Sequence, residues 1–288
     1  MSNRILYIPK EKKHAGKRKK SRTLWIIGGI TLCIVVIAGG IMIVRLHAFQ
    51  IQTISVQGLH SIHESDIERE VTSVLTGSYA FGLIPYRSLF AAPIQVITDT
   101  IAHRFPLIAE VHVKKEFPHM LAINVRERIM FGILCNDTAD RDGADKEIVP
   151  EEQIDIQCAY VDTEGIAYES APKTEGFLIT KVLTDSPVIA IGTQVIDPLM
   201  MRRIVDIKTK LPPVIGSSIV GYQLLRNVAR EVHVISKDKF SIIINRDDDL
   251  DHALSVLATI LKKEIGSRRK NLDYIDLRFG NKVFYKLR

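Results

Sequence analysis

Residues 105–128 of the 288-residue chain read FPLIAEVHVKKEFPHMLAINVRER, and their pattern predicts the structure of the first folded part. Apolar and polar side chains alternate over residues 109–113 and again over residues 121–125. Alternation with a period of two predicts two strands that each bury one face. The Phe117-Pro118-His119 segment between them predicts a turn, so the stretch is expected to form a strand pair.

Upstream of this pair, the pattern predicts one strand and two helices. Residues 49–53 alternate, and residues 54–56 continue the strand with a register change before Gly58, so an opening strand is predicted. Ser65-Asp-Ile-Glu68 fits a capping box, which predicts the start of a helix. A second helix is expected to end near Phe105-Pro106. The apolar positions that define the two helices are Ile67, Val71, Val74 and Leu75, then Ile94, Ile97 and Ile101. Residues 49–128 are therefore predicted to form a compact β-α-α-β-β unit.

Residues 129–288 are predicted to form a second, strand-rich unit with two helices, which makes the chain α+β. One helix carries Met200, Ile204, Ile207 and Leu211 on one face and is expected to stop at Pro212-Pro213. The other carries Leu250, Leu254, Leu257 and Leu261, with acidic residues 247–249 at its start as caps. The expected strands are Met130–Leu134, Ala159–Val161, Ile166–Tyr168, Val188–Ala190, Glu231–Ser236, Lys239–Asn245, Leu272–Phe279 and Lys282–Leu287.

The segment before both units has the length and composition of a membrane anchor. Residues 24–44 read LWIIGGITLCIVVIAGGIMIV, without a charge, and Arg45 closes the run. A helix of that length spans about 31 Å, close to the thickness of the hydrocarbon core. A cleavable signal peptide and a buried soluble helix are the alternatives. The long basic leader, the length of the apolar run and the lack of an A-x-A site favour an uncleaved anchor over residues 24–45.

The net charge of +6 is distributed unevenly along the chain. Residues 1–23 hold nine cations and one anion, whereas the other 265 residues hold 30 cations and 32 anions. A short, strongly basic tail of this kind stays cytoplasmic, so residues 46–288 are expected outside the cytoplasm. The tail could also contact anionic lipid. Because the folded part is not basic, nucleic acid is excluded as a partner.

The cysteines and the polar residues show no motif for a cofactor, a metal or catalysis, so we expect a binding protein. Cys135 and Cys158 lie outside the membrane, where one disulfide and two free thiols are both open readings. An acidic polar insert over residues 136–157 separates them and is read as a solvated loop. No phosphate-binding glycine loop or C-x-x-C motif occurs, and His60 with His63 reads as a solvated pair. We therefore expect no enzyme activity.

Four motifs behind the anchor together resemble the FtsQ/DivIB family of bacterial cell-division proteins. They are FQIQTISVQG at residues 49–58, the 105–128 stretch, YVDTEG at residues 160–165 and IDLRF at residues 275–279. The resemblance implies that residues 49–128 form a POTRA domain and residues 129–288 a β domain. It also implies a non-enzymatic divisome scaffold at the septum. FtsB- and FtsL-like (DivIC-like) single-pass proteins are its implied partners, and other divisome proteins would bind the POTRA domain.

The terminal hairpin is the predicted partner site. Its last strand ends near the chain terminus and is expected at a sheet edge, where a partner strand can add. Alternation places Val283, Tyr285 and Leu287 on one face. Lys282, Phe284 and Lys286 lie on the other, where plain solvation is the alternative for the lysines. Arg278 and Phe279 match family positions associated with partner contact, although core packing is the alternative for Phe279.

Two other functions are alternatives to the scaffold. A POTRA-bearing translocation or secretion component would capture extended client chains. Such proteins usually continue into a barrel of membrane strands about ten residues long, and no such series follows here. An anchored envelope hydrolase is the third reading, and no Ser/His/Asp set stands out to support it.

Overall fold

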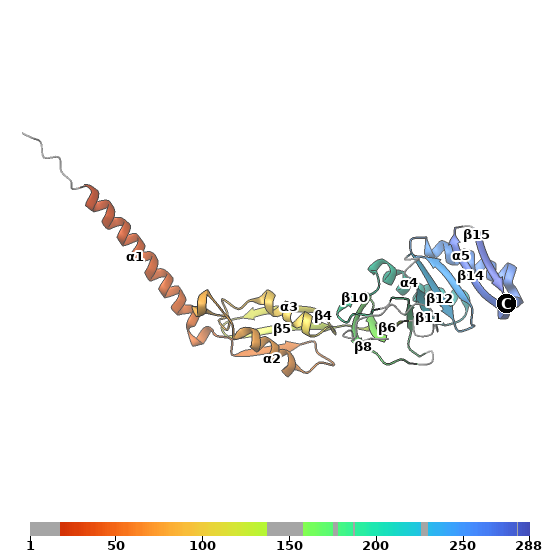
Figure 1. The fold of residues 1–288 in the computed structure, drawn as a ribbon, viewed down its shortest axis with the longest axis horizontal. Coiled ribbons are helices and arrows are strands. Elements are labelled where there is room, and N and C mark those ends of the chain that lie inside the picture. Colours follow the sequence, from red (N-terminus) through yellow and green to blue (C-terminus); the bar gives the residue numbers. More distant parts are fainter. Residues whose placement is uncertain (1–17, 137–157, 175–177, 187, 226–229, 281) are drawn as a thin grey trace, which may run out of the picture. The chain divides into compact units, whose positions relative to one another are not determined.

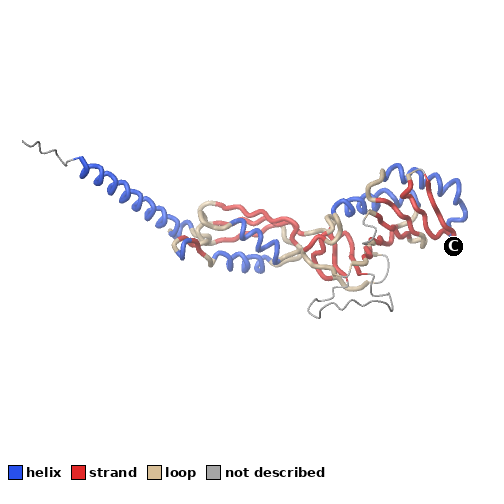
Figure 2. Tube along the Cα trace, turned by 45° about the horizontal axis from the view of Figure 1, so that its top comes forward, coloured by secondary structure: helices blue, strands red, loops and turns tan. Residues whose placement is uncertain are grey.

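The computed structural model describes residues 18–136, 158–174, 178–186, 188–225, 230–280 and 282–288 (Figures 1 and 2). The chain divides into two compact units. The first contains the chain up to Gln57 with residues 64–97 and 113–123, and the second contains residues 58–63, 98–112 and 124–288.

The N-terminal apolar run forms one continuous helix, α1, from Arg18 to Arg45. Its Leu24–Arg45 segment has 22 residues and a mean hydropathy of 2.6, and none of that segment is buried against the protein. Within the part of the chain that the structure describes, α1 is the one helix long and apolar enough to cross a membrane. A short 3-10 turn, His47–Phe49, follows it.

The β-α-α-β-β order expected for residues 49–128 is confirmed. The strands are β1 Thr53–Gln57, β4 Ile108–Glu116 and β5 Met120–Glu127, which form a sheet in the order β1-β5-β4. The helices are α2 Glu64–Leu75 and α3 Ile94–Arg104. Ile67, Val71, Leu75, Ile97 and Ile101 are buried, as the apolar spacing predicted. An additional small hairpin joins the helices through β2 Ser78–Tyr79, the 3-10 turn Ala80–Gly82 and β3 Ile84–Pro85.

Two boundaries in this region were predicted wrongly. The opening strand begins at Thr53 and not at Phe49, because Phe49 belongs to the 3-10 turn and Gln50 makes an isolated bridge with Ser88. The capping box does not form, since α2 begins at Glu64 and Ser65 lies inside it. Glu64 instead accepts a hydrogen bond of 3.1 Å from the Val56 backbone N–H, which ties the helix start to β1.

The second part of the chain is built on a ten-stranded mixed sheet in the order β10-β8-β7-β6-β9-β11-β12-β13-β14-β15. The pairs β6–β9, β9–β11 and β13–β14 are parallel and the others antiparallel. The strands are β6 Met130–Asn136, β7 Cys158–Asp162, β8 Ile166–Ser170, β9 Lys181–Thr184, β10 Thr193–Gln194, β11 Ile219–Leu224, β12 Glu231–Ser236, β13 Ser241–Asn245, β14 Leu272–Phe279 and β15 Lys282–Leu287.

Two helices of this part, α4 Pro198–Ile215 and α5 Leu250–Ile260, contribute to one large hydrophobic core with the sheet. Figure 2 shows these helices alongside the strands. Asp249 caps α5 by accepting hydrogen bonds from the backbone N–H groups of Asp251 and His252, which confirms the capping prediction. After α5 the chain continues through a π-helical turn, Leu261–Ile265, and a 3-10 segment, Gly266–Asn271.

The end of α4 corrects the sequence prediction, because the helix continues through Pro212 and Pro213 to Ile215. Proline at these positions removes two backbone donors in the last turn. Burial of both Leu211 and Ile215 stabilises the continued turn, since each has no exposed surface. Gly216 then ends the helix in the left-handed conformation at φ 58°, with its N–H bonded to the Pro212 carbonyl.

Four further corrections concern the strands: one was predicted wrongly, two were missed and one begins later than predicted. Val188–Ala190 is not a strand, and its apolar pattern reflects the burial of Ile189 in a loop. The strands β9 and β11 were missed because β9 has only four residues and β11 is interrupted by Gly221. β13 begins at Ser241 and not at Lys239, because Lys239 adopts φ 67° in the preceding turn.

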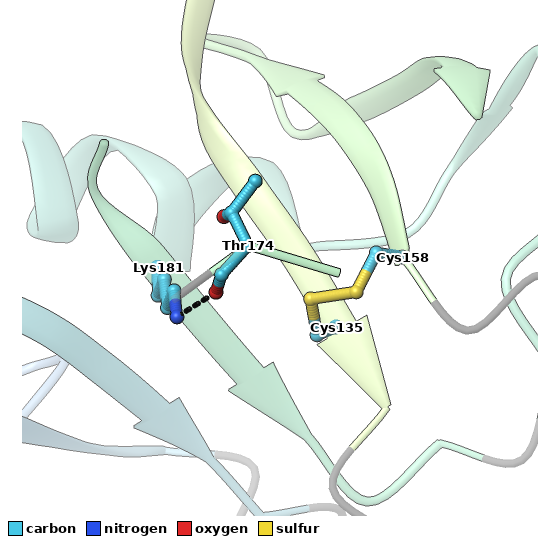
Figure 3. Close-up of a disulfide and its surroundings, with 4 residues drawn as sticks. All are labelled: Cys135, Cys158, Thr174 and Lys181. Carbon is cyan, nitrogen blue, oxygen red and sulfur yellow. Dashed lines mark hydrogen bonds between the residues drawn. A yellow bond between two sulfur atoms is a disulfide. The ribbon is translucent and has the colours of Figure 1, made fainter. Parts of the chain in front are cut away.

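Cys135 and Cys158 form a disulfide between neighbouring antiparallel strands (Figure 3). They are directly paired in the β6–β7 register, with their Cα atoms 4.1 Å apart. In the same view Lys181 of β9 donates a hydrogen bond to the Thr174 carbonyl. The disulfide closes the chain around the acidic insert, of which residues 137–157 lie outside the described part.

The YVDTEG motif forms a turn that is fixed by one carboxylate. Asp162 Oδ1 accepts hydrogen bonds of 2.9 Å from the backbone N–H groups of Glu164 and Ile166, and Oδ2 accepts one of 2.6 Å from Arg128. Gly165 adopts φ +86°, and a Cβ there would lie 2.5 Å from the Ile196 carbonyl oxygen. Asp162 and Gly165 of the motif are therefore explained by the backbone geometry of this turn.

Candidate functional site: the terminal hairpin

The two terminal strands have the bounds that the sequence predicted. β14 runs from Leu272 to Phe279 and β15 from Lys282 to Leu287, with Gly280 at φ 62° in the turn. A left-handed residue at this place suits a tight hairpin, and glycine adopts it without steric cost. At the far end the Arg288 N–H donates to the Asn271 carbonyl at 2.7 Å and closes the hairpin.

The hairpin lies at one end of the ten-stranded sheet, as predicted. β15 is last in the strand order and pairs with β14 alone among the described strands. Figure 1 shows the labelled β14 and β15 at the C-terminal end of the chain. An edge strand carries a row of backbone N–H and C=O groups on its outer side that a further strand can use.

The two faces of β15 differ as the alternation predicted. Val283, Tyr285 and Leu287 are partly buried and pack against the hydrophobic core. Lys282, Phe284 and Lys286 are exposed. Of the predicted site residues, Val283 and Tyr285 therefore have their side chains turned toward the core, where they support the strand.

A β-bulge places Phe279 beside Phe284 on the exposed face. In the register Asp276 pairs with Phe284 and Phe279 pairs with Lys282, so β14 has one additional residue over this interval. Phe279 and Phe284 are 52% and 53% exposed, and their rings meet edge to face with centroids 5.1 Å apart. Core packing of Phe279, the alternative reading of the sequence, is therefore wrong.

Arg278 lies in an internal network of charges. Its guanidinium donates to both carboxylate oxygens of Asp276, at 2.8 and 2.6 Å, and also bonds Glu231 on β12. The hydrogen bond to Asp276 is the main cause that raises the pKa of Arg278. Burial opposes ionisation of Asp276, but the hydrogen bonds from Arg278 outweigh it and lower the pKa of this carboxyl. The positive charge of Arg278 is thus largely satisfied within the fold.

The cations of β15 are more accessible than Arg278. Lys286 makes an ion pair of 3.3 Å with Asp273, with both side chains well exposed to solvent. Such a pair is weak and readily exchanged. Lys282 is exposed at the start of the strand, opposite Phe279. The hairpin's outer face therefore presents two aromatic rings in edge-to-face contact, together with two exposed lysines: Phe279, Phe284, Lys282 and Lys286.

Sequence reasoning missed Asp276 and Glu231 as partners of Arg278. The signal for Asp276 is present in the IDLRF motif, because residues two apart on a strand point to the same face. Glu231 is 47 residues away in the chain, and only the β12-β13-β14 strand order brings it near. The bulge that turns Phe279 outward leaves no recognisable signal in the residue types.

Among the described residues, no three His, Cys, Asp or Glu side chains form a group that could hold a metal ion. His60 and His63 are both exposed. The His60 backbone N–H donates to Glu127, as do those of Ser61 and Ile62.

Comparison with known families identifies one domain. Residues 49–128 match the family model described as the POTRA domain, FtsQ-type. No curated protein matches the chain. The matched domain lies directly behind the apolar α1 helix and ahead of the large mixed sheet.

Proposed function

Because residues 49–128 match an FtsQ-type POTRA domain and follow one helix that is long and apolar enough to cross a membrane, we propose that the chain is a divisome scaffold of the FtsQ/DivIB family of cell-division proteins. In this role it is non-enzymatic and links early and late division proteins at the septum. It binds partners outside the cytoplasm, with its basic tail inside and its larger part, residues 46–288, outside.

The partners we propose are FtsB- and FtsL-like (DivIC-like) single-pass proteins, which add a strand to the outer edge of β15. The observation that carries this proposal is the combination of an edge strand with an exposed aromatic pair beside it. The backbone edge gives hydrogen bonds to any extended segment, and the side chains beside it give specificity. Lys282 and Lys286 favour a partner segment with acidic residues.

The two proposed domains divide the binding tasks. Residues 129–288 carry the strand-addition site, and the POTRA domain at residues 49–128 binds other divisome proteins. The anchor lies in the membrane. Nucleic acid is not a partner in this proposal, because the excess positive charge lies in residues 1–23 and the rest of the chain is not basic. Localisation at the division septum follows from these partners.

A pull-down from cells tests the proposed site. Phe279→Glu and a deletion of residues 282–288 are each expected to abolish recovery of the FtsB/FtsL-like partners by the full chain. Leu199→Glu is the matched control, because Leu199 is 51% exposed, like Phe279, but lies on α4. Unchanged recovery with both hairpin variants would move the partner site elsewhere.

Depletion and imaging test the cellular role. Cells that lack the protein are expected to grow as filaments, and a fluorescent fusion is expected at midcell. Uniform peripheral fluorescence together with normal division would contradict the scaffold role.

A further inference from the structure

The base of the POTRA domain carries exposed apolar side chains next to the end of the membrane helix. The β2–β3 hairpin places Phe81 and Leu83 at its tip, and both are exposed. Phe90 and Phe117 are also exposed, and both rings contact the ring of Phe49, with centroids 5.3 and 5.6 Å away. We call Phe81, Leu83, Phe90 and Phe117 the basal patch.

The end of α1 is bonded directly to the tip of this hairpin. Arg45, the last residue of the helix, donates from Nη2 to the Gly82 carbonyl at 2.7 Å and from Nε to the Leu83 carbonyl at 2.9 Å. The second group is equally close in the chain, because Phe49 follows Arg45 by four residues and its N–H bonds the Leu46 carbonyl. Both parts of the basal patch are therefore fixed near Arg45.

The position of Arg45 sets the level of the patch relative to a bilayer. The 22 residues of Leu24–Arg45 span about 33 Å as a helix, slightly more than the hydrocarbon core. Arg45 then lies in the interfacial layer, and the hairpin tip bonded to it lies there too. Aromatic side chains are enriched in this layer, since their rings suit the boundary between headgroups and acyl chains.

The backbone of the tip holds Phe81 outward at an energetic cost. Ala80 and Phe81 adopt φ 51° and 54°, in the left-handed region that non-glycine residues seldom occupy. Phe81 is fully exposed in this conformation. Strain that displays an apolar ring to solvent points to a surface that covers the ring.

The charges around the patch fit the surface of a phospholipid membrane. No Asp or Glu occurs between Glu11 and Glu64, or between Glu70 and Asp99, and Glu116, which precedes Phe117, is the one acid next to a patch residue in the chain. Two cations flank the patch beside Arg45: Arg87, whose Nε donates to the Ile51 carbonyl, and Lys115, whose Nζ donates to the Phe90 carbonyl. Basic groups at this level attract lipid phosphates.

We propose that the basal patch inserts into the interfacial layer of the leaflet at which α1 ends, so that the POTRA domain has a second contact with the lipid. The bonds from Arg45 to Gly82 and Leu83 link this contact to the anchor. The contact restricts how the domain tilts on its anchor and needs no partner protein. It does not depend on the proposed role in division.

Tryptophan fluorescence in vesicles tests this contact. The full chain is prepared with Trp25→Phe, which removes its one tryptophan, and with Phe81→Trp. It is reconstituted in vesicles of zwitterionic and anionic phospholipids whose acyl chains carry bromine at a shallow position. Emission from the Phe81→Trp variant is expected to fall about threefold relative to unbrominated vesicles, because the indole ring lies at the acyl boundary.

Ile129→Trp in the same background is the matched control. Ile129 is an exposed apolar residue that lies beyond the eight residues of β5, about 26 Å along the strand from the Phe117 turn. Its emission is expected to be unaffected by bromine and to be quenched by iodide in the water. Leu83→Trp, made separately, is expected to behave like Phe81→Trp. It reports on the same patch if the Phe81→Trp variant does not fold.

A fluorescence result that overturns the proposal can be stated in the same terms. If the Phe81→Trp and Leu83→Trp variants keep their full emission in brominated vesicles and are quenched by iodide as strongly as the Ile129→Trp variant, the patch does not reach the lipid. No other protein is present in these vesicles, so such a result would assign the patch to a protein partner.

Discussion

At the scale of single residues, the contact between Arg278 and Asp276 is expected to contribute to the stability of the hairpin. Asp276 is only 5% exposed, and both of its oxygens are bonded to the guanidinium. Removing the guanidinium with Arg278→Met leaves a buried carboxylate without its cation. We expect a loss of about 2 kcal/mol near pH 7, the scale of hydrogen bonds to charged groups. Urea unfolding of the wild type and the variant measures it.

The same substitution has a defined pH dependence. Arg278 lowers the pKa of Asp276 in the folded state, so it contributes stability above the unfolded pKa near 4. That contribution is lost as the pH falls through the folded pKa. The difference between wild type and variant is therefore expected to be full at pH 7 and to shrink in acid. A difference that grows in acid would contradict this assignment.

Lys286→Met is the control for both measurements. It removes a cation from the same hairpin, but its ion pair with Asp273 is well exposed at both ends. Exposed pairs of this kind contribute less than about 1 kcal/mol, so unfolding is expected to change little.

At the scale of elements, the two faces of β15 are expected to separate stability from binding. Tyr285→Ala removes a ring that packs against the core and should cost about 2 kcal/mol or more. Phe284→Ala removes a ring that is half exposed and should cost less than about 1 kcal/mol, yet lower partner recovery strongly. Urea unfolding and pull-down of both variants measure these effects. If the two variants lost the same stability and the same partner recovery, the assignment of the two faces would be contradicted.

The disulfide is the second element with a measurable contribution. The Cys135–Cys158 bond closes a loop over a sequence separation of 23 residues, which restricts the unfolded chain by about 3 kcal/mol. The double variant Cys135→Ser/Cys158→Ser is expected to have a free energy of unfolding that is lower by about that amount. It should therefore unfold at a lower urea concentration than the wild type. Cys33→Ser is the control, because Cys33 is a free thiol in the membrane helix. Equal unfolding of the wild type and the double variant would contradict a stabilising disulfide.

At this scale the sequence predicted the elements with strong periodicity and missed the short or interrupted ones. The sequence pattern predicted the bounds of β14 and β15, because each strand is long and residues 282–287 alternate. β9 could not be found in the same way, since its four residues are defined by the parallel neighbours β6 and β11. The outward position of Phe279 depends on a bulge, which is a property of the strand pair.

At the scale of the whole molecule, the uneven charge is the basis of the proposed topology. With nine cations in residues 1–23, the tail is expected to remain in the cytoplasm. Replacing these nine cations with Gln is expected to lower the share of chains whose residues 46–288 are exported. Protease treatment of spheroplasts measures it. Replacing nine cations beyond residue 45 with Gln is the control, and equal loss of export in both would contradict the rule.

Backbone hydrogen exchange measures whether a partner strand adds to the outer edge of β15. In the free protein, the β15 N–H groups that point away from β14 have no partner among the described strands and are expected to exchange quickly. On binding of the FtsB/FtsL-like partner, exchange at these amides of residues 282–287 is expected to slow by about a hundredfold. Binding that leaves these amides as fast as in the free protein would contradict strand addition.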